Sequence, residues 1–190
     1  AIYDKPYDWK PYPVIHLDMN GLDFSSVEEL ESSLCDLVTE AAASHELTLE
    51  SANAASMFRT LINRLAEKEQ VVILVDEYDK PILNNLGKPH AQKILDKLKV
   101  FYSVIKAFES KERFVFVTGV TKFCHVSLFS ELNNLTDITM NRDYATMFGY
   151  TQSEFEAYFA DRIDSACKQL NMPREELLPE IKAWYDGYRF

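Results

Sequence analysis

Five consecutive apolar residues, 71–75, constrain the fold of this chain more than any other feature of its sequence. The run VVILV shows no alternation of apolar and polar side chains, and it ends at Asp76 and Glu77. Such a run is typical of a strand that is buried on both faces of a parallel sheet. Parallel strands need long crossover connections, which are usually helices, so the segment predicts an α/β protein.

Strands and helices alternate through the first 120 residues. Residues 14–19 and 114–117 are β-rich, and the first run ends in the turn signal Asn20-Gly21. Between the strands, apolar residues recur at helical spacing, and Ser25 or Ser26 can cap the first helix. These helical stretches cover residues 27–41, 58–65 and 94–108, and a short further strand is expected at 137–140. The pattern predicts a mainly parallel sheet with crossover helices.

From Thr151 onward the pattern is wholly helical. Thr151 and Glu154 have the spacing of a capping box, and Pro173 opens a last helix that continues to Trp184. We therefore expect an α/β core in residues 1–150 and a helical C-terminal segment in residues 151–190.

Length and composition exclude several classes of protein. The 190 residues have the size of one ordinary domain, with no membrane-spanning run and no secretory signal visible, so a cytoplasmic protein is expected.

The formal net charge of -10 argues against a nucleic-acid-binding protein. Residues 80–113 carry eight basic and three acidic residues, which we interpret as a solvated helix face; a surface that binds an anion or nucleic acid is the weaker alternative. Three cysteines without C-x-x-C spacing indicate neither a disulfide framework nor a zinc site.

Asp76 and Glu77 are the strongest candidates for chemistry. They follow the apolar strand, and open α/β sheets bind ligands at the carboxyl ends of their strands. In a P-loop nucleotide hydrolase, Asp76 would belong to the Mg²⁺ shell, and Glu77 would orient or deprotonate the attacking water. The alternative is a strand end with solvated carboxylates.

A second polar strand end follows residues 114–117. Thr118 and Thr121 supply hydroxyls there that can contact a γ-phosphate or the attacking water, the role of a nucleotide sensor. A Thr-Gly turn that merely closes the strand is the alternative. Because one crossover helix separates the two strand ends, we expect Asp76, Glu77 and Thr118 to meet at one edge of the sheet.

Five motifs, in this order, resemble the AAA-ATPase-like proteins common in gut and anaerobic bacteria, which are related to the STAND-type P-loop ATPases. They are YPVIHLDMN, VVILVDEYDKPI, FVFVTGVTKF with SLFSELNNLTDIT, YATMFGYTQSEFEAYF and WYDGYRF. The resemblance implies that Asp76 and Glu77 are the Walker B pair and that Thr118 lies near the sensor position. It also implies a P-loop NTPase-like sheet, a lid or linking region that starts in residues 151–190, and in many members a downstream PD-(D/E)xK nuclease-like domain.

The sequence departs from the family in one respect, because no G-x-x-x-x-G-K-[ST] loop occurs in it. In the family this Walker A loop and its strand lie just upstream of the segment that matches Ala1. We therefore interpret the chain as a fragment of an ATPase, inactive alone and without a tightly bound cofactor, whose intact protein would bind Mg²⁺ and ATP. Arg113 and Arg142 are candidates for the arginine of such a site by their positions near strand ends.

A sheet without the P-loop strand is expected to have a gap, an exposed edge or a swapped partner strand. We therefore expect the incomplete sheet to bind a protein partner or a second copy of the chain. The alternative function is a nucleotide-independent interaction or scaffold module that uses the helical C-terminal part.

Overall fold

The structure is a computed structural model that describes residues 6–7, 9–22, 24–120 and 134–185. The chain divides into two compact units, residues 1–135 and 136–190. The first unit is an α/β layer structure and the second is helical, so the α/β class expected from the sequence is confirmed.

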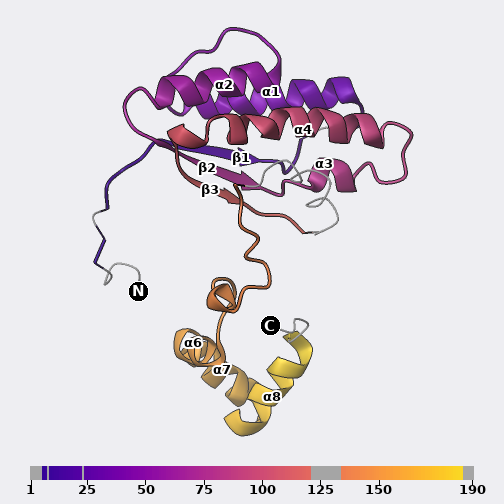
Figure 1. Ribbon diagram of the computed structural model, residues 1–190. Coiled ribbons are helices and arrows are strands. Elements are labelled where there is room, and N and C mark those ends of the chain that lie inside the picture. Colours follow the sequence, from indigo (N-terminus) through magenta and orange to yellow (C-terminus); the bar gives the residue numbers. More distant parts are fainter. Residues whose placement is uncertain (1–5, 8, 23, 121–133, 186–190) are drawn as a thin grey trace. The chain divides into compact units, whose positions relative to one another are not determined.

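The first unit is built on a three-stranded parallel sheet with the order β1-β2-β3 (Figure 1). Its strands are β1 (Val14–Asp18), β2 (Val71–Asp76) and β3 (Glu112–Val117). In the register, Asp18 lies beside Asp76, and Val75 lies beside Val117. The parallel register brings the carboxyl ends of all three strands to one edge of the sheet, which we call the carboxyl edge.

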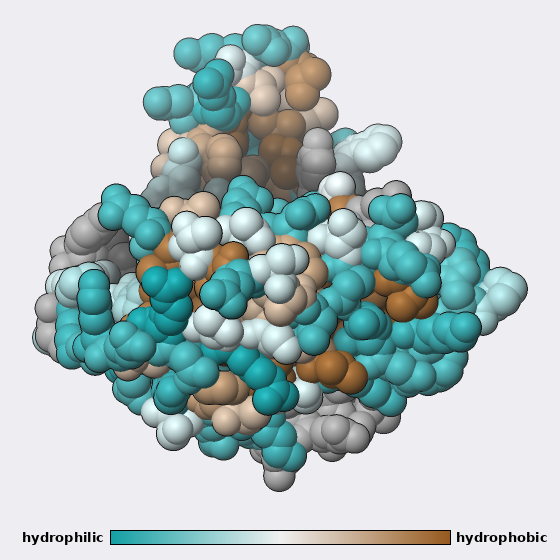
Figure 2. Space-filling view, turned by 90° about the horizontal axis from the view of Figure 1, so that it is seen from above, coloured by the Kyte–Doolittle hydropathy of each residue, from teal (hydrophilic) through white to brown (hydrophobic). Residues whose placement is uncertain are grey.

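Three long helices cover one face of the sheet: α1 (Val27–Ala43), α2 (Ala54–Leu65) and α4 (Ala91–Ala107) (Figure 1). Ser26 caps α1 by accepting a hydrogen bond from the Glu29 amide at 3.1 Å, and Asn53 caps α2 in the same way. Apolar side chains on the helices pack on the buried strand residues, and the Phe58 and Phe101 rings stack at 5.1 Å. The solvent side of this helical layer is mainly hydrophilic (Figure 2). The described residues of the unit also form a short helix, α3 (Lys80–Leu83), and a 3-10 turn, η2 (Glu109–Lys111).

The prediction that residues 71–75 are buried on both faces is wrong. Val71, Ile73 and Val75 are buried under the helices, whereas Val72 and Leu74 are half-buried on the opposite face. On the same open face, Val14 is 41% exposed and Phe114 is 53% exposed. Among the described residues of the first unit, no helix covers that face. An unbroken apolar run does not predict this arrangement. It shows that both faces of the strand are apolar, but it does not show which elements cover each face.

The second unit contains η3 (Arg142–Tyr144), α6 (Gln152–Tyr158), α7 (Ala160–Leu170) and α8 (Arg174–Tyr185). The predicted capping box is confirmed: the Glu154 carboxylate accepts from the Thr151 amide at 2.9 Å, and the Thr151 hydroxyl accepts from the Glu154 amide. The last helix begins directly after Pro173, as predicted. No helix in the described parts of the chain is long and apolar enough to cross a membrane.

The strand expected at residues 137–140 is not formed. The Asp137 carboxylate accepts a hydrogen bond from the Thr139 amide at 2.9 Å, and the Asn141 amide donates to the Ile138 carbonyl at 3.1 Å. Aspartate that bonds the backbone two residues on favours a turn over a strand.

Candidate functional site at the carboxyl edge

The structure brings Asp76, Glu77 and Thr118 together at the carboxyl edge. The Thr118 amide donates to the Val75 carbonyl at 2.8 Å, which extends the pairing of β2 and β3 by one residue. The Thr118 hydroxyl donates a hydrogen bond to Asp76 Oδ1, although the two residues are 42 positions apart. The Glu77 amide donates to the same oxygen at 3.0 Å. The convergence expected from the strand ends is therefore observed.

Two residues that the sequence did not identify as site residues hold the Glu77 carboxylate. The Asn20 side-chain amide donates to Glu77 Oε1 at 3.0 Å, and Lys80 Nζ forms an ion pair with Glu77 Oε2 at 2.6 Å. Lys80 also donates to the side-chain oxygen Oδ1 of Asn20, which closes the network. The backbone amide of Asn20 donates to Asp18 Oδ1 at 2.8 Å, which fixes Asn20 at the end of β1. The signal for Asn20 was its place directly after a strand that pairs with β2.

Glu77 has a left-handed backbone conformation, with φ of 52°. For a residue other than glycine, this region costs roughly 1–2 kcal/mol because the Cβ atom approaches the following carbonyl. Such strain is concentrated at functional sites, where the surrounding contacts maintain it. Here the contacts are the bonds from Asn20 and Lys80 to the side chain.

The end of β3 packs closely on the residues that follow β2. The Tyr78 amide donates to the Thr118 carbonyl at 3.0 Å, and the Asp79 carboxylate, which is fully buried, accepts from the Val120 amide at 3.0 Å. A Cβ atom on Gly119 would lie 2.3 Å from Tyr78 Cε1 and 2.8 Å from Asp79 Oδ1. Only glycine fits at position 119 without a shift of its neighbours. Sequence reasoning did not identify Asp79, since an acid after a strand end is usually solvated.

Three further residues were predicted for this site, and only Arg113 lies among the described residues of the first unit. Thr121 lies outside the described residues. Arg142 belongs to the second unit. Arg113 follows Glu112, which pairs with Val71, the first residue of β2. The guanidinium of Arg113 lies 5.5 Å from the centre of the Tyr12 ring. The structure therefore places Arg113 at the amino-terminal edge of the sheet, away from Asp76, and its candidacy on the ground of strand-end proximity is wrong.

The carboxyl edge offers carboxylate oxygens, the ligands that a hard divalent cation prefers. Among the described residues there is no cluster of three or more His, Cys, Asp or Glu side chains that could hold a metal ion. Mg²⁺ has different needs, because it keeps several waters and takes one or two carboxylates together with substrate phosphates. The exposed carboxylate of Asp76 fits that requirement.

A carboxylate at the opposite edge of the sheet has no such network. Glu112 begins β3, and its buried Oε1 accepts no hydrogen bond from the described residues. Partial burial, together with the nearby charge of Glu109, raises the pKa of Glu112 to about 7. This amino-terminal edge therefore carries a carboxyl group that is costly to ionise.

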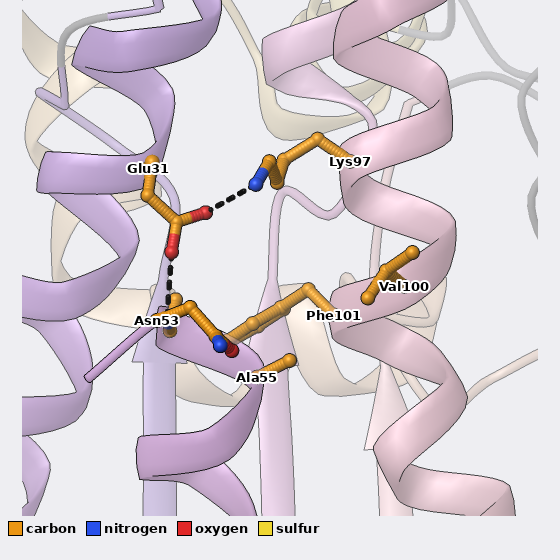
Figure 3. A pocket seen from close by; sticks show the side chains of 7 residues that line it. Glu31, Asn53, Ala55, Lys97, Val100 and Phe101 are labelled. Carbon is orange, nitrogen blue, oxygen red and sulfur yellow. Dashed lines mark hydrogen bonds and ion pairs between the residues drawn. The ribbon is translucent and has the colours of Figure 1, made fainter.

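A pocket of about 240 Å³ lies in the helical layer between α1, α2 and α4 (Figure 3). Glu31 accepts from the Ala54 amide at 2.7 Å, at the start of α2, and forms an ion pair with Lys97 at 2.9 Å. Partial burial tends to raise the pKa of Glu31, but the bonds from Ala54 and Lys97 lower it below its usual value. Glu31 thus serves as an anion at the N-terminus of α2, and its bonds fasten α1 to α2 and α4.

The parallel sheet and its polar carboxyl edge define an α/β protein whose fold is consistent with a P-loop-like fragment. A family profile described as "Predicted AAA-ATPase" matches residues 1–129. The chain therefore belongs to this AAA-ATPase-like family, as the motifs indicated.

The chain is also similar to a curated protein of Azotobacter chroococcum mcd 1, named "Uncharacterized protein in vnfD 5'region". The two are 36% identical over 193 residues, which cover 100% of this chain and 35% of that relative. The chain thus spans about a third of the length of the relative it matches. No solved structure matches it.

Proposed function

We propose that the intact protein binds Mg²⁺ and ATP and hydrolyses ATP, and that the carboxyl edge of this chain supplies its Walker B and sensor residues. The observation that carries the proposal is the hydrogen bond from the Thr118 hydroxyl to Asp76, with Glu77 directly beside it. Membership of the AAA-ATPase-like family supports the same assignment.

Each residue has a distinct role in this proposal. Asp76 would hold the Mg²⁺ shell, and the bound ion would neutralise charge that develops on the phosphates. Glu77 is the catalytic base that orients water and accepts its proton. A carboxylate has about four lone-pair positions, so the bonds from Asn20 and Lys80 leave room for a water. Thr118 senses the nucleotide through the hydroxyl that bonds Asp76, and Thr121 is assigned to the same role.

The phosphate-binding loop of the proposed enzyme comes from outside this sequence. Neither a G-x-x-x-x-G-K-[ST] loop nor any equivalent glycine-rich loop occurs in the 190 residues. Backbone amides of such a loop donate the hydrogen bonds that bind the phosphates. The chain alone is therefore proposed to bind ATP weakly and to be inactive.

Calorimetric titration of Mg-ATP into this chain and into the intact protein tests the proposal. We expect binding by the intact protein and weak or no binding by the chain alone. Asp76→Asn in the intact protein should weaken the Mg²⁺-dependent part of binding, whereas Asp96→Asn, an exposed change of the same kind on α4, should not. No binding by the intact protein would contradict the proposal.

A protein-interaction module is the second candidate, and the open face of the sheet is the observation that favours it. Val14 and Phe114 are 41% and 53% exposed there, and the rings of Phe114 and Phe116 lie parallel at 6.1 Å. Contiguous apolar surface of this kind marks interaction sites. Capture of a specific partner by the chain, together with no effect of ATP on the intact protein, would favour this function over ATP hydrolysis.

A further inference from the structure

We infer that Asp79 is a positioning residue of the carboxyl edge: it holds the backbone after β3 so that Thr118 reaches Asp76. The inference rests on the proposed function for the role of Thr118. It assigns to the third acid of the sequence DEYDK a task different from those of the first two.

The surroundings of Asp79 favour this role over that of a helix cap. Asp79 directly precedes α3, where aspartate commonly caps a helix through its side chain. It makes no side-chain capping hydrogen bond here. Its two oxygens instead accept the Val120 amide, at 3.3 Å and 3.0 Å, from a residue 41 positions away. The side chain is fully buried although Val120 is 79% exposed. A buried carboxylate is costly unless it is bonded, so this long-range bond is an important part of the site.

The loop that carries Asp79 is itself fixed from the helical layer. The hydroxyl of Tyr102, on α4, donates to the Tyr78 carbonyl at 3.3 Å. Tyr102 is completely buried, and burial, with the nearby charge of Asp79 as a further cause, raises the pKa of its phenol. The backbone next to Asp79 is therefore held by α4 on the side away from β3.

The bonds from this loop bracket Thr118. Tyr78 holds the Thr118 carbonyl, and Asp79 holds the amide of Val120, two residues further on. Between them Gly119 lies against the Tyr78 ring and Asp79, where even a methyl group would collide. With the backbone fixed before and after Gly119, Thr118 has little freedom to turn its hydroxyl away from Asp76.

The test is Asp79→Asn in the intact protein, which keeps the shape of the side chain and removes its charge and one acceptor. Amide hydrogen exchange at Val120 should become about ten-fold faster, because its acceptor is weakened. A ten-fold change corresponds to about 1.4 kcal/mol in the free energy of local opening. The kcat for ATP should fall about ten-fold or more with KM within about two-fold, because misplacement by about 1 Å can cost about 100-fold in rate. Asp96→Asn, exposed on α4, is the matched control and should change neither quantity.

Each outcome of this experiment is decisive. Unchanged exchange at Val120, or unchanged kcat in an active protein, would overturn the inference. A fall in kcat that merely follows the loss of folded protein would also overturn it in favour of a structural role. If Asp79→Asn does not fold, Val120→Pro, which removes the donor from an exposed position, should lower kcat in the same way. No ATP turnover by the unaltered protein overturns the proposed function instead, while faster exchange in the variant would still support the bond to Val120.

Discussion

The two edges of the sheet hold their carboxylates in opposite ways. At the carboxyl edge, Asp76 accepts bonds from Thr118 and Glu77, and Glu77 accepts from Asn20 and Lys80. At the amino-terminal edge, the buried oxygen of Glu112 accepts no bond from the described residues, and the pKa of Glu112 is raised to about 7. Both edges belong to the same strands and differ mainly in the donors around them.

The comparison shows that position in the sheet does not alone determine what an acid can do. Acids surrounded by donors can stay in fixed places beside a ligand, whereas an acid without donors tends to take up a proton. The carboxyl edge therefore has the arrangement expected of a binding site. At the amino-terminal edge, ionisation of Glu112 lowers the stability of the folded chain.

Gly119→Ala should produce the largest effect, because it disrupts the packing of the carboxyl edge. The new methyl group would lie 2.3 Å from the buried ring of Tyr78, so neighbouring atoms must shift. We expect the free energy of unfolding to fall by about 1–3 kcal/mol, as for other overpacked sites. Urea unfolding of the chain measures it, with Val120→Ala, at an exposed neighbour, as the control. Equal stability of Gly119→Ala and the unaltered chain would contradict the tight packing.

Glu112→Gln should reduce the difference between the edges by removing the acid that lacks donors. The folded pKa of about 7 lies above the unfolded value near 4.5, so the folded state binds more protons between these values. Stability from this group is thus complete below about pH 4.5 and is lost as the pH rises through about 7. Because the side chain is partly solvated, we expect Glu112→Gln to be more stable at pH 8 by about 1 kcal/mol, and near the unaltered chain at pH 5.

Denaturation of both proteins at pH 5 and pH 8 provides the measurement for Glu112. Glu109→Gln, which removes only the neighbouring charge, should change stability in the same direction by a smaller amount. The same difference between variant and unaltered chain at both pH values would show that Glu112 does not titrate as expected.

Thr118→Val should make the carboxyl edge more like the other edge, since Asp76 then loses a donor. Valine keeps the shape of the side chain and the Glu77 amide still donates to Asp76, so we expect a loss of about 0.5–1 kcal/mol in unfolding free energy. Thr118→Ser keeps the hydroxyl and should have nearly the stability of the unaltered chain. Equal losses in the two variants would mean that the bond to Asp76 contributes nothing.

Lys97→Met should have the smallest effect, because it removes a donor from a carboxylate on neither edge. Glu31 keeps the Ala54 amide, and its pair with Lys97 is only half-buried. We expect a loss of about 0.2–0.5 kcal/mol that diminishes at high salt. A loss as large as that of Gly119→Ala would show that the helical layer, and not the carboxyl edge, is the more tightly bonded region.

Much of the fold followed from local sequence patterns. The apolar run at 71–75, the cap at Ser26 and the capping box at Thr151 each depend on a few neighbouring residues, and the structure confirms the corresponding elements. The meeting of Asp76 and Thr118 was also predictable, because parallel strands bring their carboxyl ends together. The catalytic, metal-binding and sensing roles of Asp76, Glu77 and Thr118 remain predictions.

The other features depend on contacts between distant residues. Asn20 reaches Glu77 through the register of β1 and β2 and the left-handed backbone at Glu77, neither of which has a local signal. Asp79 is buried, and Val120 donates to it from 41 positions away. The turn at Asp137 replaced the expected strand because its side chain competes for the backbone.

The most direct test of the central claim is ATP turnover by the intact protein with Glu77→Gln. We expect turnover to fall at least about 100-fold, the usual contribution of a general base, while calorimetry shows Mg-ATP bound with similar affinity. Unchanged turnover in a protein that hydrolyses ATP would show that Glu77 is not the catalytic base and that the carboxyl edge is not the site of hydrolysis.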